Sequence, residues 1–443
     1  MLDEMVSDME SKLDILNEEA NERREEPTIF KVPEILRGVD PEAYEPKMVA
    51  LGPYHHHHHQ IKGHLEGMNE LKWHFLNKLL HQNPELGLRD YLRLVKGNAN
   101  RARDAYAERL DLSEDDLVQI LLLDCVFVIM NLWLWKMGDG YGSEAMQNNP
   151  SVVMNMPRSQ SLLGRDMLLL ENQLPFFLLQ TLFDSAFPNE HSQLTSWVVE
   201  FFSAFADNDQ KPPKVPDRSE VQFHHILHLF HSLIVVPPKG SSTTTAGRAD
   251  QNMSDDPQDL QLGWIPSATW LEEAGIKFKR REKALSFLDV SFRNGELEIP
   301  RIEVDDDTNI LFRNLIAFEQ CYGKASSDVT AYASLMSCIV ETPVDVGLLQ
   351  RNGIIISGLG SNKGVANLFN RLCKEVVVNH DTCYIASVFK EVNEHCGAYC
   401  NKWRADLCHK YFRSPWTVCS IGAAILLFLI AIAQLVFAIL KRH

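Results

Sequence analysis

The sequence lacks an excess of basic residues. Its 443 residues include 43 Lys and Arg against 59 Asp and Glu, which gives a formal net charge of −16 at pH 7. A nucleic acid partner requires a basic surface that contacts phosphates, so this composition argues against one. A diffuse acidic surface also disfavours electrostatic docking on anionic lipid, and any membrane attachment must therefore be hydrophobic.

Cysteine is scarce over most of the chain. Only Cys125 precedes residue 300, and the sequence shows no short, dense cysteine framework of the secreted kind. Residues 1–26 carry ten acidic side chains and contain no apolar segment of the type that a signal peptide needs. These absences predict reduced thiols and a main domain in the cytosol.

Known catalytic signatures are missing as well. The sequence has no GxSxG nucleophile elbow, no HExxH zinc motif, no EF-hand loop and no kinase signature. We therefore expect no catalytic residues, no cofactor and no physiological metal site.

Charge is absent from one long stretch near the C-terminus. The 25 residues from Trp416 to Leu440 include no charged side chain, and only Gln434 is strongly polar. A helix of this length spans the ~30 Å hydrocarbon core of a bilayer. We expect 414–443 to be a single-pass tail anchor with the lipid bilayer as its partner. The flanking basic residues favour a cytosolic N-terminal domain, and the plasma membrane is the favoured location.

A second apolar run, 117–137, predicts a core helix rather than another membrane span. Its polar residues Gln119, Asp124 and Asn131 would be costly in lipid. Ser113, followed by three acidic residues, is typical of the N-terminus of a helix in a soluble domain.

Helical periodicity dominates the rest of the chain. In the acidic leader, 1–27, apolar residues at three- and four-residue spacing predict a short amphipathic helix: Leu2, Met5, Met9, Leu13 and Leu16. Further helices are expected at 65–82, 86–109, 113–137, 162–187, 191–206, 219–235, 307–322, 328–341, 364–378 and 384–412. They would form one helical domain over 28–413, interrupted by a flexible loop at 237–262.

A small β element interrupts the helices. In "LDVSFRNGELEIP", apolar and polar residues alternate on both sides of Asn294-Gly295, which predicts a hairpin with a type I′ turn. Pro300 is expected to end the second strand at a sheet edge, and 353–357 predicts a further strand. The predicted fold class is mainly α: a large helical domain with a small β-hairpin element and a C-terminal transmembrane helix.

A glycine-rich turn near residue 360 has a functional and a structural interpretation. Gly358, Gly360 and Gly364 follow a strand-like run and precede a helix, as in a dinucleotide-binding turn. However, the spacing is GxGxxxG and no βαβ pattern surrounds it. We favour a helix cap formed by Ser361 or Asn362.

Two histidine-containing clusters include metal-ligand residue types. His224, His228 and His231 share one face of an expected helix, and histidines at i and i+4 can chelate zinc. Because no general base lies between them, we favour a polar helix face beside an apolar stripe. The second cluster consists of His395, Cys396, Cys400 and His409. Packing in an apolar environment is favoured there, because no second cysteine pair follows.

The stretch "LLLENQLPFFLLQ" places Glu171, Asn172 and Gln173 inside an apolar helix, where Pro175 should introduce a kink. A carboxylate in an apolar site could act in catalysis with a raised pKa. We favour the alternative, a hydrogen-bonded network that fixes helix packing. The candidate partners in this network are Asp124, Arg165 or Arg158.

Several longer motifs occur in order along the chain. They are "TIFKVPEILRGVDPEAYEPKMVALGPYHH", "GRDMLLLENQLPFFLLQTLF", "ATWLEEAGIKFKRREKALSFLDVSFRNGELEIP", "IEVDDDTNILFRNLIAFEQC", "DVGLLQRNGIIISGLGSNKGVANLFNRLCKEV" and "NKWRADLCHKYFRSPWTVCSIGAAI". Together they resemble the plant-specific family called domain of unknown function 247 (DUF247, UPF0481-type), from about Thr28 onward. The motif residues that carry this resemblance include Pro33, Gly52, Pro53, Tyr54, His55, Glu171, Asn172, Gln173, Pro175, Asn314, Glu319 and Trp416.

The resemblance implies a plant membrane-associated protein with a single C-terminal span and no established enzymatic activity. We expect a non-enzymatic recognition role, exerted through contacts with an unknown protein partner. One alternative is a pollen-side self-incompatibility determinant, a role in which some grass members of the family are implicated. Another is a membrane-tethered enzyme with a site near Glu171, and complete hydrogen bonding of Glu171 would count against it.

Five consecutive histidines, 55–59, fall at the end of the first motif. His55 and His56 match the GPYHH pattern of the family, and 57–59 resemble a local extension. Neutral imidazoles bind nickel or zinc adventitiously, but a flexible run offers no fixed tetrahedral geometry. We therefore expect no physiological metal site here.

Overall fold

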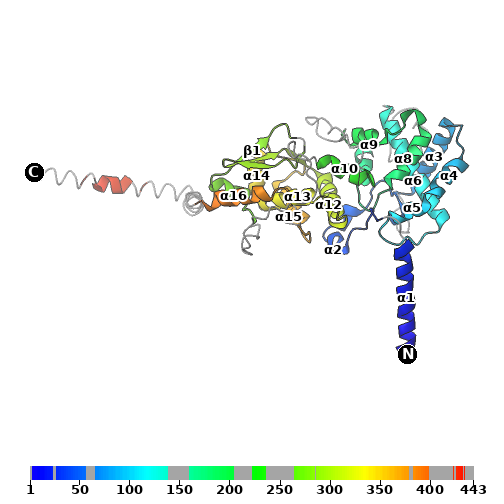
Figure 1. Ribbon diagram of the computed structural model, residues 1–443. Helices are drawn as coiled ribbons and strands as arrows, with labels where there is room; N and C mark the ends of the chain where they lie inside the picture. Colours follow the sequence, from blue (N-terminus) through cyan, green and yellow to red (C-terminus); the bar gives the residue numbers. More distant parts are fainter. Residues whose placement is uncertain are drawn as a thin grey trace, which may run out of the picture. The chain divides into compact units, whose positions relative to one another are not determined.

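The computed structural model describes residues 2–22, 26–55, 65–137, 159–203, 222–235, 264–284, 286–378 and 383–398, with 423, 426–432 and 434 near the C-terminal end. In these residues the chain is mainly helical with two small sheets, so the predicted mainly α class is confirmed (Figure 1). The predicted loop at 237–262, His56 to His59, and both Trp416 and Leu440 lie outside the described residues.

The chain forms two compact units, and each is discontinuous in sequence. The first, here called the helical unit, comprises Met1–Thr244, Asp305–Thr330 and Arg371–Thr382. The second, the sheet unit, comprises Thr245–Val304, Ala331–Asn370 and Cys383–His443. Both units draw on 28–413, the region that we treat from sequence as a single domain.

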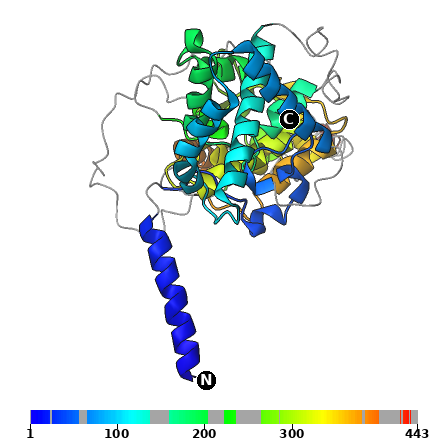
Figure 2. The same cartoon turned by 90° about the vertical axis from the view of Figure 1, so that its right-hand side faces the viewer.

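The helical unit is built around α6 (Glu114–Lys136), most of whose apolar side chains are buried. Five helices pack against it: α3 (Glu66–Gln82), α4 (Leu88–Gly97), α5 (Ala99–Asp104), α8 (Phe176–Ala186) and α9 (Leu194–Ser203). Figures 1 and 2 both show these helices gathered together. The Ser113 hydroxyl caps α6 by accepting the Asp116 N–H at 3.1 Å, as the sequence predicts.

Among the described residues, α6 is also the one helix that by itself is long and apolar enough to cross a bilayer. Its side chains are buried within the helical unit, which confirms the predicted core helix. The pair α13 (Asp328–Ile339) and α14 (Pro343–Arg351) meets the same test only jointly, across a bend of 107°.

The remaining elements of the helical unit are short, apart from the helices α1 and α12. They are α1 (Leu2–Glu22), α2 (Glu34–Arg37), η1 (Pro41–Tyr44), η2 (Pro53–His55), α7 (Ser159–Asp166), η4 (Pro188–Glu190), α10 (Ile226–Ile234) and α12 (Asp306–Cys321). The helix predicted in the acidic leader is confirmed as α1. The helix predicted over 86–109 is divided into α4 and α5, with Asn98 between them.

The sheet unit contains the hairpin that the sequence predicts. Strand β2 (Ser291–Arg293) pairs antiparallel with β3 (Glu296–Pro300), and Phe292 lies opposite Leu297. Asn294 and Gly295 have φ values of 53° and 79°, the left-handed conformations that a type I′ turn requires.

The predicted edge position of Pro300 is wrong. A further strand, β1 (Lys277–Arg281), pairs in parallel with β3 and makes β3 the central strand of the order β1-β3-β2. Four of the five residues of β1 are basic, and this composition hides the strand in the sequence. Pro300 is tolerated because it is the last residue of β3, where its missing N–H removes no bond from the middle of the ladder.

A second sheet and five helices, among them most of α13, complete the sheet unit. Strand β4 (Ile302–Val304) pairs in parallel with β5 (Ile355–Ser357), which confirms the strand predicted near 355. The other helices are α11 (Ala268–Glu273), α14, α15 (Asn362–Leu372) and α16 (Ala386–Gly397). Near the C-terminal end, residues 426–432 are helical, but most of the predicted transmembrane helix lies outside the described residues, so it stays a prediction.

Asp345 ties α11 to α14 inside the sheet unit. Its side chain is fully buried; Oδ1 accepts the N–H and hydroxyl of Thr269, and Oδ2 accepts the N–H and hydroxyl of Thr342, all at 2.7–2.9 Å. Replacing Asp345 with Ala should lower the free energy of unfolding by about 3 kcal/mol, because four donors lose a buried, charged acceptor.

Urea denaturation of the detergent-solubilised full chain, followed by circular dichroism, measures this loss. The matched control is Glu341→Ala, an exposed residue four positions earlier, which should change stability by less than about 0.5 kcal/mol. Equal midpoints for the two variants would contradict the assigned role of Asp345.

Candidate functional site

The polar triplet Glu171-Asn172-Gln173 lies in a turn between two helices. The chain leaves α7 at Asp166 and enters α8 at Phe176, with Pro175 at the N-cap position. The predicted continuous helix over 162–187 with a kink is therefore wrong. Proline disfavours helical conformation in the residue before it and lacks an N–H, so it starts α8 rather than bending a longer helix.

Glu171 binds a segment near the N-terminus. Its Oε1 accepts the N–H of Val32 at 2.6 Å, and its Oε2 lies 2.5 Å from Nη2 of Arg37, which also pairs with Glu45. The carboxylate is buried and both oxygens are engaged. Two of the predicted partners, Asp124 and Arg165, bind elsewhere, and the third, Arg158, lies outside the described residues.

Asn172 holds the chain just before the GPY motif. Its Oδ1 accepts the N–H of Leu51 at 2.6 Å, and its Nδ2 donates to the carbonyl oxygens of Val49 and Asp166 at 3.0 and 2.8 Å. The amide therefore uses its donor and its acceptor between two segments more than 100 residues apart, which is the role expected of a buried structural network.

Gln173 completes the triplet. Its Nε2 donates to the carbonyl oxygens of Met167 and Leu169, which closes the turn on itself. Its Oε1 accepts the N–H of Leu227 at 3.0 Å in the first turn of α10, and its carbonyl accepts the hydroxyl of Tyr106. The favoured interpretation of the triplet as a hydrogen-bonded network is confirmed.

Asp166, which the sequence does not single out, holds the same N-terminal segment. Its carboxylate accepts the N–H groups of Lys47, Met48 and Val49 at 2.5–3.1 Å. Burial raises the pKa of Asp166, and the neighbouring guanidinium of Arg165 opposes that rise.

Asp124 of α6 binds the next part of this segment. Its Oδ2 accepts the N–H of Gly52 at 2.8 Å, and its Oδ1 lies 2.5 Å from Nζ of Lys72 on α3. The Lys72 ammonium also donates to the carbonyl of Ala50. Asp124, whose charge would be costly in lipid, is thus neutralised by a buried cation and hydrogen-bonded to the backbone.

The GPY motif follows directly. Gly52 has φ +71°, and a Cβ atom there would lie 2.8 Å from the carbonyl oxygen of Gln173, so the position accepts only glycine without strain. Tyr54 donates to the carbonyl of Ile29, and its ring packs edge-on against Tyr106. His55 is buried beside them.

Asn314 and Glu319 extend the network along α12. Asn314 accepts the N–H of Leu170 at 2.9 Å and donates to the carbonyl of Ala43. Glu319 is bound by Nε2 of His231 at 2.7 Å, and it also accepts the N–H groups of Val329 and Thr330. With Pro33 at the N-cap position of α2, every described family-motif residue therefore lies in the helical unit.

The predicted polar face on α10 is wrong. His231 is buried against Glu319, and His225, which the sequence does not single out, is fully buried at the N-cap, where Nδ1 accepts the N–H of His228. His224 precedes the helix and stacks on His228 with ring centroids 4.9 Å apart. In the part of the chain that the structure describes, no three metal-ligating side chains converge.

The structure also describes the glycine-rich turn and part of the second histidine–cysteine cluster. The Ser361 hydroxyl accepts the N–H of Gly364 at 3.1 Å and α15 begins at Asn362, so the interpretation of the glycine-rich turn as a helix cap is confirmed. Cys396 is buried in α16, whereas Cys400 and His409 lie outside the described residues.

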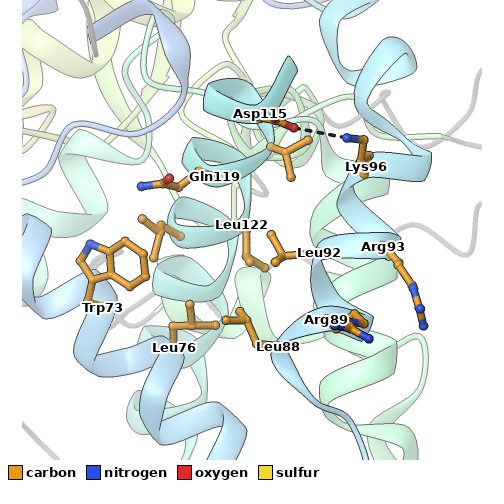
Figure 3. Close-up of a pocket in the computed structure, with 12 residues that line it drawn as sticks. Trp73, Leu76, Leu88, Arg89, Leu92, Arg93, Lys96, Asp115, Gln119 and Leu122 are labelled. Atoms are coloured by element: carbon orange, nitrogen blue, oxygen red, sulfur yellow. Dashed lines mark hydrogen bonds and ion pairs between the residues drawn. The ribbon is translucent and has the colours of Figure 1, made fainter. Parts of the chain in front are cut away.

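An open groove lies on another side of the helical unit, between α3, α4 and α6 (Figure 3). It has a volume of about 430 Å³, and apolar side chains form most of its lining: Trp73, Leu76, Leu88, Leu92, Val118, Leu122 and Leu123. Arg89, Arg93 and Lys96 of α4 form a basic rim. The sequence analysis does not identify this groove. Its signal in the sequence is a leucine followed directly by an arginine, repeated one helical turn later at Leu88-Arg89 and Leu92-Arg93.

Comparison with known proteins places this chain in a family. The model of DUF247, described as a plant protein of unknown function, matches residues 29–430. The chain belongs to the DUF247 family. This confirms the family that the ordered motifs predict.

Two proteins of Arabidopsis thaliana are similar to this DUF247 protein. A UPF0481 protein is 31% identical over 425 residues, which cover 93% of this chain and 86% of the relative. A putative UPF0481 protein is 21% identical over 522 residues, which cover 97% and 93%, respectively. No solved structure matches the chain.

Replacing Gly52 with Ala should destabilise this DUF247 protein by about 3 kcal/mol, because the Cβ meets a backbone oxygen and φ is positive. The matched control is Gly67→Ala in α3, where a Cβ meets no atom within 4 Å and should add about 0.5–1 kcal/mol of helix stability. Thermal unfolding of both variants measures the difference. Equal melting temperatures for the two variants would contradict the strain that we predict for a side chain at residue 52.

The α10 histidines predict a dependence of stability on pH. Burial, together with His224 and His231, lowers the pKa of His228 to about 3, so the folded protein keeps this ring neutral at pH 5. The unfolded chain, with a pKa near 6.5, takes up the proton instead. The contribution of His228 to stability is therefore full above about pH 6.5 and should fall by about 2 kcal/mol between pH 7 and pH 5.

Urea denaturation at pH 7 and pH 5 measures this loss in wild type and in His228→Gln. The variant should lose about 2 kcal/mol less on acidification, because glutamine does not titrate. The raised pKa of Asp166 is common to both proteins and cancels in the comparison. An identical pH dependence in the two would contradict the assigned pKa of His228.

Proposed function

We propose that this DUF247 protein is a single-pass membrane protein at the plasma membrane, and that its two units lie in the cytosol apart from the C-terminal span. The observation that carries this proposal is the apolar helix near the C-terminal end. Six of its large apolar side chains are 44–66% exposed: Leu426, Leu427, Phe428, Leu429, Ile430 and Ile432. A helix that is apolar on all sides needs either a protein core or lipid around it, and the uncharged run of Trp416–Leu440 has the length of a span.

We further propose that the protein acts by recognising other proteins rather than by catalysis. In the helical unit, Asp124, Asp166, Glu171 and Glu319 are buried, and each accepts hydrogen bonds from backbone N–H groups. A carboxylate that is already saturated by fixed donors is poorly placed to accept a proton from a substrate. The alternative of an enzyme site at Glu171 is disfavoured for this reason, because Val32 and Arg37 occupy both of its oxygens.

Membrane fractionation tests the anchor. The double variant Leu429→Arg/Ile430→Arg should move the protein from the carbonate-resistant pellet to the soluble fraction, because each arginine at the centre of a span costs about 3 kcal/mol. Deleting 414–443 should have the same effect. The matched control, Leu429→Val/Ile430→Val, keeps the apolar character and should remain in the pellet. Retention of the deletion variant in the pellet would refute the anchor.

A further inference from the structure

We propose that the groove between α3, α4 and α6 binds helix α1 of a second copy of this chain. The inference rests on the proposed role in protein contacts and specifies the partner. It follows from three properties of the two surfaces: their apolar character, their opposite charges and their matching lengths.

The groove has the chemistry of a helix-binding surface. Trp73 and Leu88 remain 51% and 43% exposed at its edges, above a floor formed by Leu76 and Leu122. Large apolar side chains gathered on an exposed concave face of a folded protein are typical of docking sites for amphipathic helices.

The rim of the groove is basic along one side. Arg89, Arg93 and Lys96 follow one another on α4 over seven residues, which is about two helical turns. Arg93 pairs with Asp90 at 3.4 Å, and Lys96 pairs with Asp115 at 3.2 Å and with Glu114 at 4.0 Å, all in solvent-exposed ion pairs. Exposed pairs of this kind contribute little, so the cations can exchange them for a partner's carboxylates.

Helix α1 has the complementary surface. Its apolar stripe is exposed by 46–73% and consists of Leu2, Met5, Val6, Met9 and Leu13. The first 26 residues carry ten acidic and three basic side chains. Asp3 and Glu10 border the stripe on one side and are seven residues apart, the same separation as Arg89 and Lys96.

The lengths also agree. The stripe from Leu2 to Leu13 spans about 17 Å, and α4, with ten residues, spans about 15 Å. About three turns of α1 therefore lie along the groove, with the stripe on the apolar floor and the acidic edge on the basic rim.

We assign the partner as a second copy because, among the residues that the structure describes, nothing covers either surface. Both the stripe of α1 and the groove are exposed in the single molecule. Each copy carries one helix and one groove, so two copies can exchange helices symmetrically and close the dimer. Anchoring in one membrane raises the effective concentration of the two copies and favours this exchange.

Photo-cross-linking of the full-length protein in membranes tests the exchange. Two differently tagged copies are expressed together, each with a photoreactive amino acid at Met9. We expect an adduct that carries both tags, and peptide mapping should place the cross-link on α4 or α6. An adduct within a single chain, or no adduct with both tags, would overturn the inference.

Charge reversal distinguishes a cross-link caused by binding in the groove from one caused by a high local concentration in the membrane. Arg89→Glu/Lys96→Glu should reduce the double-tagged adduct at least tenfold, and adding Asp3→Lys/Glu10→Lys should restore at least half of it. The matched control, Arg293→Glu/Arg351→Glu, makes the same change in net charge at exposed positions of the sheet unit and should leave the adduct unchanged. Equal losses in both pairs, or no recovery, would refute the groove as the site.

Failure of this inference is distinguishable from failure of the proposed function. If the wild-type protein stays in the membrane pellet but yields no double-tagged adduct, the anchor stands and the second copy is not the occupant. If the protein leaves the pellet with its span intact, the proposed membrane function itself fails.

Discussion

Side-chain oxygens, rather than a neighbouring strand, hold the chain between Lys47 and Gly52, and much of the helical unit depends on this clamp. The acceptors are Asp166 at the end of α7, Asn172 in the turn that follows, and Asp124 in the middle of α6. A buried backbone N–H must find a partner, so this segment is ordered only while the three side chains are in place. The clamp thus joins the N-terminal segment to the central helix and to a turn more than 100 residues away.

The charges within this clamp specify its geometry more than they add stability. Moving ions such as Lys72 and Asp124 out of water costs about as much as their attraction returns, but leaving one without the other is strongly unfavourable. The same holds for Glu171 and Arg37. Each pair therefore disfavours any conformation that separates its two charges. The positive φ of Gly52 and its close approach to Gln173 fit the conformation in which both pairs are formed.

Local signals in the sequence predict local structure well here. Ser113 and the polar residues of 117–137 identify α6, and Asn294-Gly295 identifies the hairpin and its turn type. Long-range pairing is not encoded in any one stretch: Glu171 binds Val32 and Arg37, whereas Asp124 and Arg165, which the sequence offers as partners, bind elsewhere. The strand β1 is missed for a related reason, because a basic segment becomes a strand only when β3 is beside it.

The molecule buries a few carboxylates and leaves large apolar side chains exposed in two places that need different surroundings. The run from Leu426 to Ile432 is uncharged, so hydrocarbon can surround it without stranding an ion. The stripe on α1 is bordered by carboxylates, which an anionic bilayer surface repels. A cover for α1 must therefore offer apolar contact and positive charge together, which is the combination that Leu88 and Leu92 form with Arg89 and Arg93 on α4.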